Sequence, residues 1–234
     1  MNYENRYQKW EEVAKKYKVD NSRIATFKLT IQNVLRLLKN KKEGLALDVG
    51  CGFGYIDILL AKNTNFKIIA IDISDTALEA ARKIVQREGF EHRIKVERGD
   101  IYNLDYPDNY FDIIFSFGYV SAATYPNARK EVYRVLKPGG IFICDFINHR
   151  SLYKIFFLPK NLILGYAKIR EITGIKNKFK KDGFELVSCR YFNTFPPIFK
   201  KNIPPDIYIF FEKTVGRLLR LVLARTMLFC FRKN

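Results

Sequence analysis

Three glycines at alternate positions follow a short apolar run and could bring the chain backbone close to a ligand. They are Gly50, Gly52 and Gly54, in the stretch LDVGCGFG at residues 47–54. Glycine has no Cβ, so the backbone can turn tightly there and a ligand can approach it. In α/β folds such a loop lies at the carboxyl end of a strand, where nucleotide-like ligands bind.

The spacing of these glycines separates the loop from two common phosphate-binding motifs. A dinucleotide fingerprint reads G-x-G-x-x-G, but Tyr55 stands at the place of its third glycine. The G-x-x-x-x-G-K-[ST] pattern of a phosphate-binding loop is absent. An acid, Asp48, lies two residues before the first glycine. We therefore interpret the loop as built for a ligand with a ribose and an amino-acid end, and not for a pyrophosphate.

Two further acids follow the next two strands expected along the chain. Asp72, followed by Ile73, could accept hydrogen bonds from both hydroxyls of a ribose, a charge-assisted contact. Asp100 could accept from the exocyclic amine of an adenine, while the backbone N–H of Ile101 faces a ring nitrogen. The structural alternatives are a helix cap for Asp72 and a turn for Asp100. Phe117, after the fourth strand, is expected beside the reacting centre.

Alternating strands and helices are expected to position these residues. The strands are nearly continuous apolar runs, which is typical of a parallel sheet covered by helices on both faces. The order of the elements predicts a doubly wound sheet with right-handed crossovers. Ser22 is expected to cap the second helix, and Ser74 or Asp75 the fourth. Strands are expected at 45–49, 67–71, 94–97, 111–115, 141–146, 184–192 and 226–232, and helices at 4–18, 22–40, 55–62, 75–88, 128–136, 177–181 and 207–224.

Taken together, these motifs resemble those of class I S-adenosylmethionine-dependent methyltransferases of the small-molecule type. The resemblance covers about residues 40–146 well and 176–234 in outline. It implies an α/β, Rossmann-like sheet of seven strands, doubly wound and mostly parallel, with N-terminal helices and a C-terminal helical insertion. The last strand would be antiparallel and inserted near the edge. The matching stretches are LDVGCGFG at 47–54, AIDIS at 70–74, GDI at 99–101, YFDIIFSFG at 110–118 and LKPGG with the strand after it at 136–146.

The resemblance also implies an enzyme with S-adenosylmethionine as cofactor and S-adenosylhomocysteine as product. The glycines and the Asp48 region would hold the methionine end, Asp72 the ribose and Asp100 the adenine. Residues 1–234 would form a single methyltransferase domain, with a helical cap at 1–40 and insertions at 149–175 and 195–224 that form a lid or substrate region. The full set of expected cofactor-binding residues is Asp48, Gly50, Cys51, Gly52, Gly54, Asp72, Ile73, Asp100, Ile101 and Phe117.

Methyl transfer needs little chemical assistance from the protein, because the methyl group on a sulfonium is already activated. The acceptor atom must lie in line with it at about 3 Å, with water excluded. A base is needed only for an acceptor that enters protonated, so the catalytic residues stay unknown. His149 is a weak candidate, the alternative being a surface histidine. Tyr119 and Tyr125 either line the acceptor pocket or pack. The four cysteines are far apart and fit no zinc spacing, so no metal is expected.

The charge of the chain is strongly positive, at a net +17, and it is uneven. Residues 150–234 hold 18 basic and 5 acidic side chains. This indicates an anionic partner, namely a membrane surface, a nucleic acid or an acidic substrate, unless the lysines only keep the protein soluble. Lys213, Arg217 and Arg220 share one face of the apolar helix expected at 207–224. That helix is expected to be a lid, a membrane-interface helix or a cover for the sheet edge.

These observations favour methyl transfer to an O, N or C atom of a small or lipid-like acceptor. The alternatives are an RNA methyltransferase that uses the basic C-terminal region, and a protein that binds S-adenosylmethionine without turnover. The N-terminus lacks the apolar core of a signal peptide, and no run reaches the ~18 apolar residues of a membrane span. A cytoplasmic location, with peripheral contact to an anionic membrane left open, is expected. The sequence indicates no oligomeric state.

Overall fold

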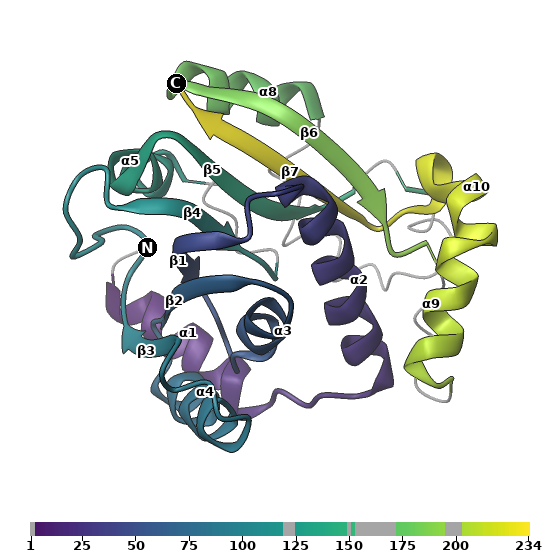
Figure 1. Cartoon of the computed structure of the whole chain (residues 1–234), viewed down its shortest axis with the longest axis horizontal. Coiled ribbons are helices and arrows are strands. Elements are labelled where there is room, and N and C mark those ends of the chain that lie inside the picture. Colours follow the sequence, from purple (N-terminus) through teal and green to yellow (C-terminus); the bar gives the residue numbers. More distant parts are fainter. Residues whose placement is uncertain (1–2, 119–124, 149–150, 153–171, 195–202) are drawn as a thin grey trace.

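Seven strands form one sheet at the centre of the computed structural model, which describes residues 3–118, 125–148, 151–152, 172–194 and 203–234. The strands lie in the order β3-β2-β1-β4-β5-β7-β6 (Figure 1). Their bounds are β1 Glu43–Val49, β2 Asn65–Asp72, β3 Ile94–Arg98, β4 Phe111–Ser116, β5 Leu136–Ile147, β6 Phe184–Phe192 and β7 Thr226–Lys233.

The strand directions confirm the predicted fold class. β1 pairs in parallel with β2 and β4, and the parallel pairing continues to β3 on one side and β5 on the other. β7 is antiparallel to both of its neighbours and is inserted between β5 and β6. The chain order reverses between β1 and β4, so their carboxyl ends open at a switch point, where ligands bind in such sheets.

Helices cover both faces of the sheet, and each face has its own apolar core. The first core joins side chains of α2, α3, α4 and α9 to the sheet, and the second joins those of α5 and α8. Two cores explain why the strands are apolar on both sides. In the described part of the chain no helix combines the length and apolarity of a membrane span. The helices are α1 Tyr3–Lys15, α2 Asn21–Leu38, α3 Tyr55–Asn63, α4 Asp75–Arg87, α5 Pro126–Val135, α8 Ile172–Lys181, α9 Pro205–Lys213 and α10 Val215–Leu223.

The caps of two helices test the expected helix starts. The predicted cap of α2 is wrong, because Asp20 caps this helix by accepting from the backbone N–H of Arg23 at 3.0 Å, and Ser22 lies inside the first turn. The prediction for α4 is confirmed, because the Ser74 hydroxyl accepts from the Ala77 N–H at 3.2 Å. Most other bounds differ from the expected ones by a few residues.

The helix expected over 207–224 is two helices instead, α9 and α10. The break lies at Thr214, whose φ of −96° and ψ of −91° are not helical. It allows Gly216 to approach the end of β6 so closely that a Cβ there would collide with the Thr194 hydroxyl. The Glu212 carboxylate, in the last turn of α9, accepts from the Asn193 and Thr194 N–H groups at 2.7 and 2.8 Å. These contacts of Gly216 and Glu212 therefore hold both helices against the segment that follows β6.

The buried ammonium group of Lys233 joins the last strand to the α5–β5 corner. It donates to the Asn109 side chain and to the backbone carbonyls of Tyr133 and Leu136, at 2.7–2.8 Å. Removing it would leave the buried carbonyl of Leu136 and the partly buried carbonyl of Tyr133 without this donor.

We expect Lys233→Met to lower the free energy of unfolding by about 1–3 kcal/mol, since the carbonyls stay wholly or partly buried when the donor is lost. Urea denaturation measures this. The matched control is Arg232→Met, because the neighbouring Arg232 is exposed and its nearest acidic oxygen, on Glu185, is 3.9 Å away. The control should change stability by less than about 0.5 kcal/mol. Equal losses in the two variants would contradict the role given to Lys233.

Candidate functional site

The glycine loop leaves β1 and enters α3 with three backbone conformations that favour glycine. The φ angles are +80° at Gly50, +55° at Gly52 and +75° at Gly54. A Cβ on Gly50 or Gly52 would meet no atom within 4 Å, so the space beside the loop is open. At Gly54 a Cβ would lie 3.3 Å from the Cβ of Ala81, so this glycine also allows α4 to pack closely. The loop is thus open at Gly50 and Gly52, which we call the glycine cradle, and closely packed against α4 at Gly54.

The Asp72 carboxylate connects this loop to the start of α4. One oxygen accepts from the Gly52 N–H and the other from the Ser74 N–H, both at 2.9 Å. Burial raises the pKa of Asp72, and the hydrogen bonds from Ser74 and Gly52 oppose the shift. Each carboxylate oxygen can accept more than one hydrogen bond, so two further donors such as vicinal hydroxyls fit. The helix-start role and the ligand role predicted for Asp72 are therefore compatible.

Asp100 lies after β3 and contacts a helix that is far away in sequence. Its carboxylate forms an ion pair with Arg6 of α1 and accepts from the Tyr102 N–H at 3.1 Å. The Arg6 guanidinium also lies 4.2 Å above the centre of the Tyr102 ring. The turn named as the structural alternative at this position is present, because the Asn103 N–H donates to the Asp100 carbonyl.

Helix α1 lies beside α4 and contacts the start of that helix (Figure 1). The Glu11 carboxylate accepts from the Ser74 hydroxyl at 2.7 Å and from Thr76, whose hydrogen bond is the main cause that lowers the pKa of Glu11. Tyr17, just after α1, meets the Phe53 ring of the glycine loop edge to face at 4.9 Å. The roles of Arg6, Glu11 and Tyr17 could not be predicted, because nothing local in the sequence marks a contact with residues so distant.

Two buried acids, Asp48 and Asp57, lie beneath the glycine loop. Asp48 Oδ1 and both Asp57 carboxylate oxygens are buried and lack hydrogen-bond partners among the described residues. Burial and the carboxylate of Asp57 raise the pKa of Asp48 well above its usual range. Burial also raises the pKa of Asp57, to about 7. The pair therefore retains a proton at neutral pH. Asp48 was expected at the site from the sequence, whereas Asp57 was expected only as part of a helix, with no role.

The end of β4 completes the site. Phe117 is half-buried and stacks on Phe115 with ring centres 5.8 Å apart. The Gly118 N–H donates to the carboxylate of Asp145 in β5 at 3.0 Å, a contact that the sequence did not indicate. Two of the candidate acceptor-side residues, His149 and Tyr119, lie outside the described residues. Tyr125 is exposed, and its ring meets the Tyr102 ring edge to face.

The structure thus gathers most of the predicted cofactor residues at the carboxyl ends of β1 to β4. Ile73 and Ile101 are half-buried directly after Asp72 and Asp100, and Cys51 is buried in the loop. Burial raises the pKa of the Cys51 thiol well above its usual range, so the thiol is protonated and unreactive. An open glycine cradle, a carboxylate that can take two hydroxyls and a second carboxylate near an aromatic ring fit a nucleoside that carries an amino-acid end.

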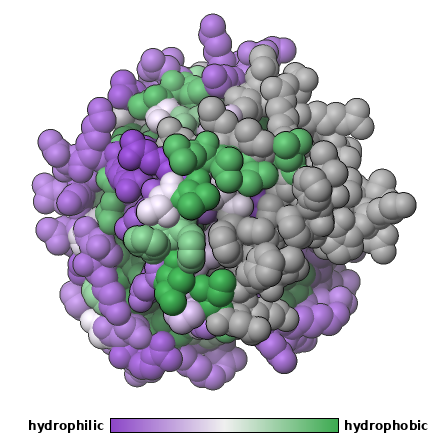
Figure 2. Space-filling model, turned by 90° about the vertical axis from the view of Figure 1, so that its right-hand side faces the viewer, coloured by the Kyte–Doolittle hydropathy of each residue, from purple (hydrophilic) through white to green (hydrophobic). Residues whose placement is uncertain are grey.

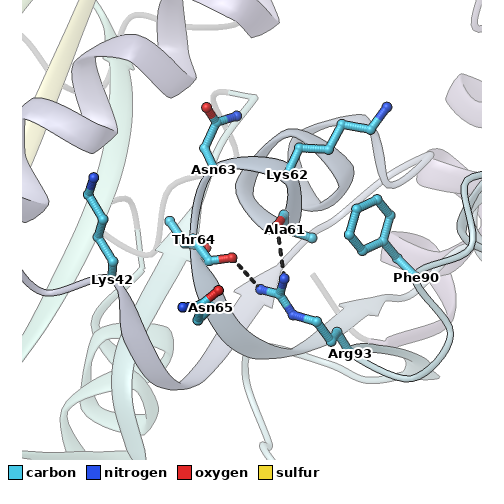
Figure 3. A pocket seen from close by; sticks show the side chains of 8 residues that line it. All are labelled: Lys42, Ala61, Lys62, Asn63, Thr64, Asn65, Phe90 and Arg93. Carbon is cyan, nitrogen blue, oxygen red and sulfur yellow. Dashed lines mark hydrogen bonds between the residues drawn. The ribbon is translucent and has the colours of Figure 1, made fainter.

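A separate hollow of about 450 Å³ lies at the opposite end of β2 (Figure 3). The Arg93 guanidinium extends across it and donates to the backbone carbonyls of Ala61, Thr64 and Phe66. Through these hydrogen bonds, the guanidinium connects the end of α3 to the start of β2. Within the described residues no group of three His, Cys, Asp or Glu side chains could hold a metal ion.

Comparisons with known proteins bear on this site. Residues 46–140 match the family described as "Methyltransferase domain". The chain is 31% identical over 155 residues to the sterol 24-C-methyltransferase erg6 of Aspergillus fumigatus, covering 62% of this chain and 41% of that protein. It is 30% identical over 160 residues to the demethylmenaquinone methyltransferase of Anoxybacillus flavithermus, covering 63% of this chain and 67% of that one.

A solved structure has the same fold. It is phosphoethanolamine N-methyltransferase 2 of Haemonchus contortus in complex with S-adenosyl-L-methionine, with a TM-score of 0.63 and 19% identity over 88% of this chain and 52% of that chain. The chain spans 40–57% of the length of several curated relatives that it matches.

The Asp48–Asp57 pair predicts a pH-dependent stability. The pKa of Asp57 in the folded chain, about 7, lies above the 3.8 of an ordinary aspartate, so the folded state binds a proton that the unfolded state releases. Stability is lost as the pH rises between these two values. Asp57→Asn should remove this loss. Its free energy of unfolding relative to wild type should rise by about 1 kcal/mol or more from pH 5 to pH 8.

Urea denaturation at each pH value measures the effect. The control is Asp105→Asn, which changes an exposed acid and should shift stability equally at all pH values. If the relative stability of Asp57→Asn did not change with pH, the pair would hold no extra proton.

Proposed function

This chain belongs to the class I S-adenosylmethionine-dependent methyltransferases, and we propose that it methylates an O, N or C atom of a small or lipid-like acceptor. The observation that carries the proposal is the open glycine cradle with Asp72 and Asp100 at the carboxyl edge of the sheet. The relatives named for a sterol and for demethylmenaquinone support a lipid-like acceptor.

The proposed roles of the site residues follow from their positions. Asp72 would accept from the two ribose hydroxyls with the lone pairs that Gly52 and Ser74 leave open. The backbone at Gly50 and Gly52, beside Asp48, would hold the methionine end. Cys51, Gly54 and Ile73 would shape the cradle. When bound, S-adenosylmethionine supplies a methyl group that its sulfonium already activates.

The adenine end would be recognised where α1 meets β3. Asp100 would accept from the exocyclic amine, with the Ile101 N–H facing a ring nitrogen. The same carboxylate pairs with Arg6, so the ring must share Asp100 with the guanidinium or displace it. Helix α1 is therefore proposed as the part of the 1–40 cap that closes over the cofactor and excludes water from it.

The acceptor side is proposed to be built from Phe117 and from the insertions at 149–175 and 195–224. Phe117 would present an apolar wall at the end of β4. A base is required only for an acceptor that enters protonated, and His149 stays a prediction for that role. Positioning of the acceptor would supply most of the rate.

A direct test is a screen for S-adenosylhomocysteine release with candidate acceptors, including a quinol, a sterol and a small amine, with and without detergent. We expect turnover with an apolar acceptor that detergent micelles disperse. Turnover only with RNA, falling steeply with salt, would contradict the lipid-like acceptor. Cofactor binding without turnover on any acceptor, RNA included, would contradict the methyl transfer itself.

We expect Asp72→Ala to weaken S-adenosylmethionine binding by about 1.5–3 kcal/mol, because a charge-assisted contact is lost. Titration calorimetry measures the affinity. Asp72→Asn, which keeps one acceptor oxygen, should give a smaller loss. Glu79→Gln, an exposed change on α4, is the matched control and should leave the affinity unaltered. An unchanged affinity in Asp72→Ala would show that the ribose does not bind there.

A further inference from the structure

Helices α9 and α10 expose an apolar stripe. In each helix the exposed residues recur at positions i, i+3 and i+4, the spacing of one helix face. Leu218 is 84% exposed and Phe210 is 63% exposed, whereas Tyr208 and Ile209 on the other side of α9 are buried. Figure 2 shows hydrophobic residues gathered on the side of the molecule where these helices lie. The stripe consists of Ile207, Phe210, Phe211, Val215, Leu218 and Leu219.

A basic pocket of about 830 Å³ adjoins the stripe, between α2, β6 and the two helices. Four cationic side chains line it, namely those of Arg36, Arg190, Lys213 and Arg217. The one acidic side chain among its described lining residues, Glu212, is turned to β6, where it accepts from Asn193 and Thr194.

Arg190 gives a more specific sign that the pocket takes an anion. Its Nε atom is buried and lacks a hydrogen-bond partner among the described residues. A buried donor without a partner costs free energy, and an anionic oxygen in the pocket would supply that partner. Lys213 and Arg217 belong to the same two helices as the stripe, so one partner can contact both features.

We propose that α9 and α10 dock on the surface of a bilayer that contains anionic lipids. The apolar stripe enters the boundary between headgroups and acyl chains, and the basic pocket takes a lipid phosphate. A helix with an apolar face beside basic residues binds such an interface through buried apolar area and through attraction to anionic lipids. The net charge of +17 adds long-range attraction to the same surface.

Two other partners fit these features less well. Single-stranded RNA would be bound by stacking on aromatic rings, but most of the stripe is aliphatic, and Val215, Leu218 and Ile207 offer no ring. A second copy of this chain would bring its own cationic pocket residues to the contact, and like charges repel. The bilayer satisfies the apolar stripe and the cationic pocket together. This proposal goes beyond the proposed function and does not depend on it, because docking can be measured without turnover.

The test is co-sedimentation of the full chain with vesicles of phosphatidylcholine, with and without phosphatidylglycerol. We expect binding to the anionic vesicles that falls as salt rises. Phe210→Ser combined with Leu218→Ser should lower the partition coefficient at least about tenfold, because two large exposed apolar side chains are lost. Val13→Ser, at a residue of α1 that is 44% exposed, is the matched control and should bind like the wild type.

The charge contribution has its own pair of variants. Lys213→Gln with Arg217→Gln should remove the preference for phosphatidylglycerol. Lys83→Gln with Lys95→Gln, which neutralises two exposed lysines of α4 and β3, should keep it. Calorimetry with S-adenosylmethionine on the stripe variant and on both charge variants should give the wild-type affinity, so a failure of docking is distinguishable from a failure of the cofactor site.

Several results would overturn the proposal. They are equal sedimentation of the stripe variant and the wild type, absence of binding to either vesicle, and binding of RNA without binding of vesicles. Saturable binding of inorganic phosphate in the pocket without vesicle binding would assign it to a soluble anion instead. If the double stripe variant fails to fold by circular dichroism, the single Leu218→Ser variant, at the most exposed residue of the stripe, decides the question.

Discussion

The two hydrogen bonds of Asp72 hold the site together. This one carboxylate accepts from the glycine loop that leaves β1 and from the segment that starts α4, so it fixes the position of both. Ser74, which it orients, in turn caps α4 and donates to Glu11 of α1. The loop, the helix and the N-terminal cap therefore depend on a single side chain at the carboxyl end of β2. Pairing of β1 with β2 along the full length of β1 makes that position reproducible.

Acidic side chains gather around the glycine loop, although the chain as a whole is cationic. The buried carboxyl of Asp48 lies near those of Asp57 and Asp72, and burial is the main cause that raises the pKa of all three. The positive ends of the α3 and α4 dipoles offset part of that cost. An acidic, partly protonated cradle suits a ligand with ammonium and sulfonium groups, since the positive charges would stabilise the ionised carboxylates.

The sequence predicted the sheet and the loop well because their signals are local. Apolar runs separated by helical patterns mark where the strands lie along the chain, and the glycine spacing marks a turn that other residues adopt at a cost. The antiparallel placement of the last strand was implied only by the resemblance to the methyltransferases. Contacts between distant segments carry no such signal, so Arg6 on Asp100 was missed, as was the burial of Asp57 inside a helix. The break at Thr214 was missed for the same reason, because it depends on how Gly216 fits against Thr194, just after β6.

The two proposed contact surfaces lie at opposite edges of the sheet. Helices α1 and α4 lie on the side of β2 and β3, whereas α9 and α10 lie beside α2 and β6 at the other edge (Figure 1). A bilayer bound at α9 and α10 leaves the α1 side facing water. A charged, water-soluble cofactor would then enter past Arg6 and Asp100, and an apolar acceptor would arrive from the opposite edge. The antiparallel β7 contributes to this separation, because it inserts between β5 and β6 and extends the sheet away from the glycine loop.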